Sequence, residues 1–291
     1  MKIESTLSDR VVFFSELNVK NYKNFLKETY GQLSELNLKQ CENSICDLLA
    51  NSIDEPLESI RDMDLIDVLS LILELRIVGI SPLCKILVNV PGKNKPTSVD
   101  FNLDLLKNDL ISLNKKLHQT IQFDAVTIKL GCPSFNSLLF KERGYRYIKS
   151  IQINECKLAI KTEEDLNLVF NSLPSKVFLE VNKISEHIEK VFEEYSLLAR
   201  YNVNQKLTFY PNIYNILWFT KLVFSEDLQV FYTTFFNMCY AGHMDANYLE
   251  SITLGEYNFF VNCLRNALNP PKNSEELPPV KDSAESENSG F

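Results

Sequence analysis

Hydrophobic residues recur at helical spacing over most of this chain. The clearest pattern follows Ser225, where apolar side chains fall at positions i, i+3, i+4, i+7, i+8 and i+11 before Gly242. These side chains should share one face of a helix, and they are Leu228, Phe231, Tyr232, Phe235, Phe236 and Cys239. Similar patterns predict helices at about residues 18–31, 36–51, 62–79, 163–171, 174–199, 213–224 and 255–268.

Capping signals and composition refine these helices. Thr162 with Asp165, and Thr253 with Glu256, have the spacing of capping boxes, in which two side chains bond the free N–H groups of a first turn. Segment 62–79 is apolar on nearly every side, which predicts a buried central helix that begins at an Asp62 cap.

The hydrophobic period changes to that of β-strands in three places. Residues 11–17 predict a short strand, and 84–90 with 97–103 predict a β-hairpin around a turn-rich loop. Residues 121–131, 145–154 and 157–160 predict a small antiparallel sheet. The polar amphipathic segment 104–118 is expected to act as a hinge between two halves of the chain.

This order of elements predicts an α+β fold that is predominantly α-helical. We expect an N-terminal helical subdomain with a β-hairpin at 1–110, then a small central antiparallel sheet and a helical C-terminal subdomain at 111–268. Residues 269–291 contain four prolines and a net acidic charge, which predicts a disordered acidic tail.

Composition narrows the class of function. The 291 residues carry a net charge of -8 and only eight glycines, which never cluster, so a P-loop and a dinucleotide-binding loop are excluded. The longest apolar stretch is interrupted by charges, so we expect no stable membrane insertion. The N-terminus lacks the apolar core of an export signal, and the seven cysteines include no CxxC pair. A cytosolic location with reduced thiols follows.

One set of residues has metal-like spacing. Cys41 and Cys46 form one pair, and Cys239 and His243 form another. Tetrahedral zinc needs four ligands, and nothing local brings the two pairs together, so ordinary core cysteines are favoured. We predict no metal, no cofactor and no catalytic residue.

Cys132 supports an alternative function from another class. A cytosolic cysteine-dependent hydrolase or transferase would use its thiol as the nucleophile. That chemistry requires His118, His187 or His243 within hydrogen-bond reach of the sulfur.

A basic segment supports a second alternative. Residues 141–150 interleave basic and aromatic side chains on a predicted strand, a mixture typical of single-stranded nucleic-acid binding. Because the chain as a whole is acidic, a protein contact or a solvated strand edge protected by its charge is the favoured interpretation. The candidate residues are Arg143, Tyr145, Arg146, Tyr147 and Lys149.

The aromatic content favours a role in assembly. The chain has 19 Phe and 12 Tyr, concentrated at residues 214–219 and in the helix after Ser225. Aromatic side chains dominate the buried centres of protein interfaces. Phe231, Tyr232, Phe235 and Phe236 are therefore the first candidates for an interface.

Several segments together resemble a known family. They are LNVKNYKNFLK (17–27), DLIDVLSLILELRIVGIS (64–81), IKLGCPS (128–134), LNLVFNSLPSKVFLEV (166–181), EDLQVFYTTFFNM (226–238) and YLESITLGEYNFFVNCLRN (248–266). In this order they are similar to the baseplate hub proteins of T-even-like bacteriophages. Some members carry cysteine pairs in the hairpin, whereas the loop here reads NVPGKNKP (89–96) and contains no metal ligand.

The resemblance implies a structural or assembly protein of a contractile phage tail. Such a late protein would act without enzymatic activity in formation of the baseplate hub. It would work in the host bacterial cytoplasm during assembly, either as an assembly factor alone or as a part that stays in the tail baseplate of the virion. Its expected partners are other hub and tail proteins. A small-molecule substrate and nucleic acid are not expected.

Overall fold

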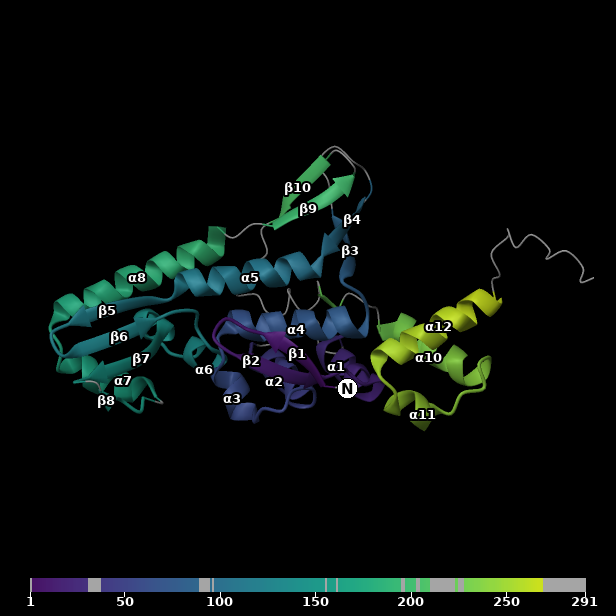
Figure 1. The fold of residues 1–291 in the computed structure, drawn as a ribbon, viewed down its shortest axis with the longest axis horizontal. Helices are drawn as coiled ribbons and strands as arrows, with labels where there is room; N and C mark the ends of the chain where they lie inside the picture. The colour runs from purple at the N-terminus through teal and green to yellow at the C-terminus, as the bar shows by residue number, and fades with distance from the viewer. Residues whose placement is uncertain are drawn as a thin grey trace, which may run out of the picture.

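The molecule is elongated, with its helices and sheets arranged along one long axis (Figure 1). The computed structural model describes residues 2–30, 38–88, 95, 97–154, 156–160, 162–194, 197–202, 205–209, 223–224 and 228–268. The Ser225 cap, all but the end of the helix predicted at 213–224, and the 269–291 tail lie outside these residues. The fold is α+β and predominantly helical, as predicted.

Helix α4 (Leu65–Gly79) lies in the middle of the core. Most of its residues are buried, because its sequence leaves almost no polar face to present to water. The helix begins after Asp64, whereas the predicted cap Asp62 ends the short helix α3 (Leu57–Asp62). The helices α1 (Val19–Tyr30) and α2 (Leu38–Ala50) complete this part, and Asn18 caps α1 as predicted.

A two-stranded ribbon lies over these helices. Strand β2 (Val11–Ser15) was predicted from its hydrophobic pattern, and it pairs with β1 (Lys2–Thr6), which was not. Val12 and Phe14 point into the core, and the alternate residues Val11 and Phe13 are exposed.

The predicted hairpin is present as β3 (Leu83–Val88) and β4 (Thr97–Asn102). It belongs to a four-stranded sheet of order β10-β9-β4-β3, in which β9 (Leu197–Asn202) and β10 (Gln205–Phe209) form a second hairpin. The prediction that residues up to 199 continue a helix is therefore wrong. Asp100 on β4 pairs with Arg200, and this distant partner makes the segment a strand.

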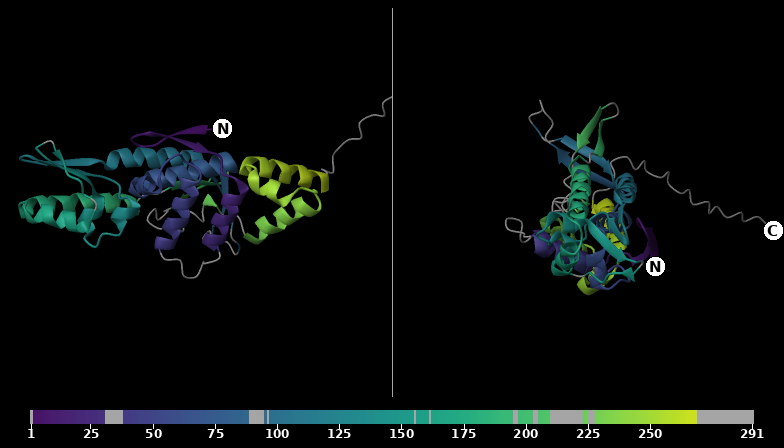
Figure 2. Two further views of the ribbon diagram at one scale, coloured as in Figure 1. Left: turned by 90° about the horizontal axis from the view of Figure 1, so that it is seen from below. Right: turned by 90° about the vertical axis from the view of Figure 1, so that its left-hand side faces the viewer.

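The segment predicted as a hinge is one unbroken helix, α5 (Leu103–Leu117). The Asn102 side chain caps it by accepting hydrogen bonds from the N–H groups of Asp104 and Leu105. Its apolar face packs along α4, and Lys107 forms an ion pair there with Glu74. This packing, rather than a flexible joint, connects the core to the second sheet (Figure 2).

The small antiparallel sheet was predicted, but its first strand is a hairpin. Residues 121–131 divide into β5 (Gln119–Phe123) and β6 (Val126–Leu130), with Asp124 at a positive φ of 48° in the turn. Strands β7 (Ile148–Ile153) and β8 (Cys156–Lys157) complete the order β5-β6-β7-β8.

Helices cover this sheet at one end of the molecule (Figures 1 and 2). Helix α8 (Ser175–Glu194) contacts β5, β6 and the 3-10 helix η1 (Arg143–Tyr147). Gly144 allows η1 to approach, because a Cβ there would collide with Asn182 of α8. Two short helices, α6 (Phe135–Leu138) and α7 (Glu163–Asn171), are also described in this part of the chain, and the predicted Thr162 capping box opens α7.

In the part of the chain that the structure describes, helices α10, α11 and α12 lie at the opposite end of the molecule (Figure 2). Helix α10 (Leu228–Tyr240) carries the predicted aromatic pattern, and α12 (Leu254–Leu268) opens with the predicted box between Thr253 and Glu256. Helix α11 (Ala246–Ser251) was not predicted. All three contact α1, so the end of the described chain returns to its beginning.

Candidate functional site

The aromatic residues of α10 divide between the core and the surface. Phe231 is wholly buried, and its ring centre lies 5.7 Å from that of Tyr22 on α1 and 5.8 Å from that of Tyr257 on α12. Phe235 is half-buried, and its ring stacks on that of Tyr257 with ring centres 6.4 Å apart. Phe231 was a candidate interface residue, but α1 and α12 already cover it, so no partner can reach it.

The surface part consists of Tyr232, Phe236 and Tyr240, which we call the α10 face. Their exposures are 37%, 63% and 74%, and their spacing of four residues aligns them along the helix. The rings of Phe236 and Tyr240 stack with centres 5.7 Å apart and an interplanar angle of 7°. The Nζ of Lys27 on α1 lies over the Tyr232 ring, 5.9 Å from its centre. Tyr240 was not among the candidates, although its position four residues after Phe236 was a usable signal.

A second apolar surface lies on the β1–β2 ribbon. Val11 and Phe13 are about half exposed, and they line a groove of about 410 Å³ with Lys2, Asp54 and Glu55. Lys2 bonds Asp54 at 2.9 Å, so the charges of the rim are partly neutralised. The sequence predicted the strand but did not indicate this surface.

The basic segment is not an exposed strand. Residues 143–147 form the 3-10 helix η1, in which Tyr145 and Tyr147 are buried. Arg143 forms an ion pair with Glu189 of α8, and the Nε of Arg146 donates to the Phe140 carbonyl at 2.8 Å. Both tyrosine rings are therefore unavailable for stacking on bases, and the two arginines already hold internal partners.

Lys149 and its surroundings form a polar junction at Asp64. Lys149 of β7 forms an ion pair with Asp64, and the Nε2 of His118 lies 3.3 Å from the Asp64 Oδ2. The Asn114 amide of α5 donates to the same oxygen at 3.0 Å. Asp64 therefore joins the start of α4 to α5 and to the second sheet. No sequence motif indicated this junction, because its members are distant in the chain.

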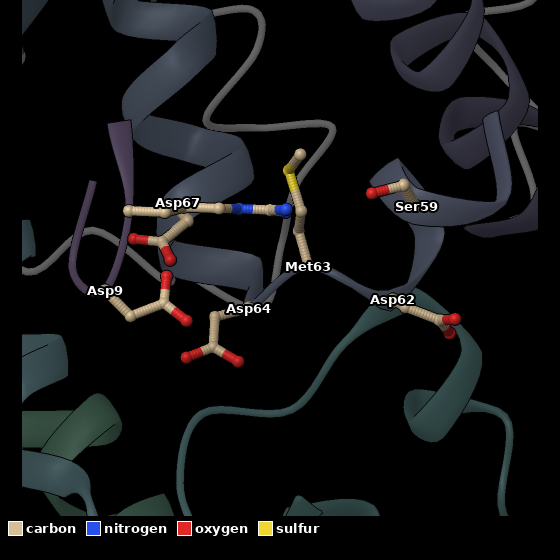
Figure 3. A pocket seen from close by; sticks show the side chains of 7 residues that line it. Asp9, Ser59, Asp62, Met63, Asp64 and Asp67 are labelled. Carbon is tan, nitrogen blue, oxygen red and sulfur yellow. The ribbon is translucent and has the colours of Figure 1, made fainter. Parts of the chain in front are cut away.

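The junction continues into the turn of the β1–β2 ribbon. The Ser8 hydroxyl donates to Asp67 at 2.6 Å and accepts from the Asn114 amide at 2.8 Å. Beside it is an open pocket of about 330 Å³, also lined by Asp9, Arg10 and Asp62. Figure 3 shows Asp9, Asp64 and Asp67 gathered on one side of this pocket and Asp62 on the other.

Burial and hydrogen bonds shift the pKa values at this junction in opposite directions. Burial raises the pKa of Asp64, but hydrogen bonds from His118, Lys149 and Asn114 outweigh it and hold that pKa below its ordinary value. The same contact with Asp64 raises the pKa of His118. Burial raises the pKa of Asp67, against the hydrogen bonds from Ser8. These shifts describe an internal polar network that connects elements of the fold.

Cys132 does not have the environment of a nucleophile. Its side chain is fully buried, and burial together with the nearby Asp64 raises the pKa of its thiol far above its ordinary value. The thiol donates to the Pro133 carbonyl at 3.5 Å. His118 contacts Asp64, whereas His187 and His243 are exposed on α8 and after α10. The cysteine-dependent alternative therefore has no support in this geometry.

The described members of the two candidate metal-ligand pairs, Cys41 with Cys46 and Cys239 with His243, are not arranged as a metal site. Burial raises the pKa of Cys46 to about 12, whereas the Cys41 side chain lies outside the described part. His243 follows α10 at a φ of 52° and is exposed. Among the residues that the structure describes, no group of three or more His, Cys, Asp and Glu side chains is placed to hold a metal ion.

Comparison with protein families decides the class of the protein. Residues 1–195 match the model of the family described as T4 bacteriophage base plate protein, and this segment is most of the chain. The chain belongs to that family. Comparisons with curated proteins and with solved structures give no match.

The residues that match the baseplate family model can be located in the structure. It spans the β1–β2 ribbon, the core around α4, the second sheet and α8, and it includes the Asp64 junction and the groove at Phe13. The α10 face lies beyond the matched residues. Membership supports a structural role in the phage tail and contacts with other tail proteins. None of the described helices is long and apolar enough to cross a bilayer.

Proposed function

We propose that this baseplate-family protein acts in formation of the baseplate hub of a contractile phage tail, through protein–protein contacts. In this proposal it is a late protein that works in the host bacterial cytoplasm during assembly and becomes part of the tail baseplate. Its partners are other hub and tail proteins. Family membership supports the baseplate part of the proposal, and the resemblance of residues 226–238 and 248–266 to hub proteins supports the hub part.

The observation that carries the proposed contact is the exposure of the α10 face. A monomer gains nothing by presenting three aligned aromatic rings to water, because each exposed ring forgoes a large hydrophobic stabilisation. The face also lies on a fixed support. Phe231 and Phe235, on the inner side of the same helix, are held by Tyr22 and Tyr257. The rings are therefore held ready for a partner, which lowers the entropic cost of binding.

The partner surface should be concave and apolar, with acidic groups at its edge. The α10 sequence contains no charged residue, so the centre of the contact is apolar. Lys27 lies beside Tyr232 at the margin of the face and favours an acidic neighbour. This composition matches the apolar core and polar rim of ordinary protein interfaces.

Co-purification tests the proposal. The tagged protein is co-expressed in bacteria with each hub and tail protein of the phage that encodes it, and bound partners are identified by mass spectrometry. We expect a hub protein to co-purify with the native chain and to be lost, by at least about tenfold, with Phe236→Ser combined with Tyr240→Ser.

Two variants serve as matched controls. Leu168→Ser changes an equally exposed apolar residue on α7, at the other end of the molecule, and should leave co-purification unchanged. Phe13→Ser tests the groove on the β1–β2 ribbon. Recovery of only non-hub baseplate proteins would contradict the hub assignment. Equal loss in the Leu168 control would contradict the assignment to the α10 face.

A further inference from the structure

A segment of the same chain has the composition and the reach to occupy the α10 face. Residues 269–291 follow α12 directly and lie outside the described part. Their longest apolar run is Leu277–Pro278–Pro279–Val280, preceded by Glu275 and Glu276. We propose that residues 275–280 dock on the α10 face of their own molecule and cover it.

The length of the chain permits this contact. Helix α12 packs on α10 through Tyr257, which lies against Phe231 and Phe235. Leu268 lies 11 residues further along α12, a distance of about 17 Å at the helical rise. Leu277 follows Leu268 by nine positions along the chain, and nine extended residue steps span about 30 Å. The apolar run therefore reaches α10 without any change in the three helices.

The chemistry of the two surfaces is complementary. A Pro-Pro segment favours the polyproline II conformation, whose flat apolar sides bind to aromatic grooves at low entropic cost. Aligned aromatic rings are what such a segment recognises, and Tyr232, Phe236 and Tyr240 supply them. Tyrosine hydroxyls also suit the carbonyl groups of a proline-rich segment, which its missing N–H groups leave free.

Charge favours the same arrangement. Residues 269–291 carry two lysines and five acidic residues, a net charge of -3. The α10 helix has no charge, and Lys27 at its margin forms no salt bridge with a described residue. The acidic residues of α11 are engaged elsewhere, because Asp245 caps that helix and Glu250 forms an ion pair with Lys23. Glu275 and Glu276 would therefore meet a cation rather than a competing carboxylate.

Such docking regulates the proposed interface. The tail keeps the aromatic rings from aggregating before assembly, and a hub partner must displace it. Because the tail is tethered, its effective concentration is in the millimolar range, so even a weak contact covers the face until a tighter partner arrives. This consequence rests on the proposed function, whereas the docking itself rests only on the face and the tail.

Photo-crosslinking in the full-length chain tests the docking. The variant Phe236→p-benzoylphenylalanine is irradiated in the absence of any partner, digested with trypsin and analysed by mass spectrometry. Cleavage after Lys272 and Lys281 gives a peptide of residues 273–281 that contains the whole docking segment. We expect a cross-link from position 236 to this peptide, and a yield at least about threefold lower when Glu275→Gln and Glu276→Gln, which remove the charges without adding a tryptic site, are introduced.

The control places the same photoreactive group at Leu168, which is as exposed but at the far end of the molecule. Equal mixtures of isotopically labelled and unlabelled chains distinguish contact within one molecule from contact between two. A tail cross-link that is equally strong at position 168, that joins labelled to unlabelled chains, or that is missing from position 236 would each overturn the proposal. Because no hub protein is present, the result is independent of the hub assignment.

Discussion

At the scale of single residues, the pattern of aromatic side chains does not reveal which of them are available to a partner. Phe231 and Phe236 both belong to the apolar stripe of one helix, yet Phe231 is wholly buried and Phe236 is 63% exposed. The difference comes from α1 and α12, which cover one side of the stripe. A single sequence predicts the stripe but not the neighbours that divide it.

Paired substitutions on α10 test this division. Phe231→Ala should lower the free energy of unfolding by about 3–5 kcal/mol, because it leaves a cavity among Tyr22, Phe235 and Tyr257. Phe236→Ser should change it by no more than about 0.5 kcal/mol, because that side chain is already in water. Urea denaturation followed by circular dichroism measures both. Similar losses in the two variants would place both rings in the core.

His118 makes stability depend on pH. Its pKa is raised in the folded state by contact with Asp64, so it contributes stability that is complete below its ordinary pKa of about 6.5. That contribution disappears as pH rises through the raised value. We expect the native chain to lose less than about 1 kcal/mol across this window, because the imidazole is partly exposed.

The variant His118→Gln provides the comparison for this pH effect. It should lose the slope between pH 6 and 8 and show a weaker slope at acidic pH, where protonation of Asp64 removes stability, because Lys149 and Asn114 still lower the pKa of Asp64 but His118 no longer does. Urea midpoints at half-unit pH steps measure both slopes. An unchanged slope near neutral pH in this variant would assign the titration to another group.

At the scale of elements, the sequence predicted correctly those helices and strands that are determined by interactions between residues close together in the chain. The Thr162 and Thr253 capping boxes, the buried α4 helix and the β3–β4 hairpin are present because their hydrogen bonds and apolar faces lie within a few residues of one another. The predictions were wrong where pairing with a strand far away in the sequence determines the secondary structure. Residues 197–199 are strand because β9 pairs with β4, about a hundred residues earlier in the chain.

Only part of the candidate functional site could be predicted from the sequence, for the same physical reason. Helical spacing alone indicated Tyr232 and Phe236, and both are exposed, whereas their role in an interface stays a prediction. The Asp64 junction was missed, because Ser8, Asp64, Asn114 and Lys149 come together only when four separate elements are packed. Tyr145 and Tyr147 were misplaced because an interleaved basic and aromatic pattern does not report burial under α8.

The capping box of α12 gives a prediction at this scale. Thr253→Ala removes the hydroxyl that accepts from the Glu256 N–H at 3.2 Å, and should lower the free energy of unfolding by about 1 kcal/mol. Thr233→Ala, on the exposed side of α10, is the matched control because its hydroxyl only donates to a carbonyl of its own helix. Thermal denaturation compares them, and an equal effect of the two substitutions would argue against the cap.

At the scale of the whole molecule, the chain returns on itself. Helices α10, α11 and α12 contact α1, and α12 also contacts α4, so the two ends of the described chain share one core cluster. The sheet of β5 to β8 lies at the other end of the long axis (Figure 1). The α10 face and the family-matched groove at Phe13 therefore belong to a continuous body.

The division into units at 1–110 and 111–268 stays a prediction, and expression of the separate fragments tests it. Fragment 111–268 would expose Phe231 and Tyr257, which the intact chain buries against α1 and α4. We therefore expect that fragment to unfold without cooperativity and to be restored by mixing with 1–110. Cooperative unfolding of 111–268 by itself would support two independent units.

The proposed function depends on the α10 face acting in hub assembly. The most direct measurement is electron microscopy of tails from cells infected with the encoding phage in which the gene carries Phe236→Ser and Tyr240→Ser. We predict that the variant folds as the native chain does, and that baseplates without a hub accumulate while complete tails fall by at least about tenfold. Complete tails at normal yield from cells that contain only the folded variant would contradict a role of the α10 face in hub assembly.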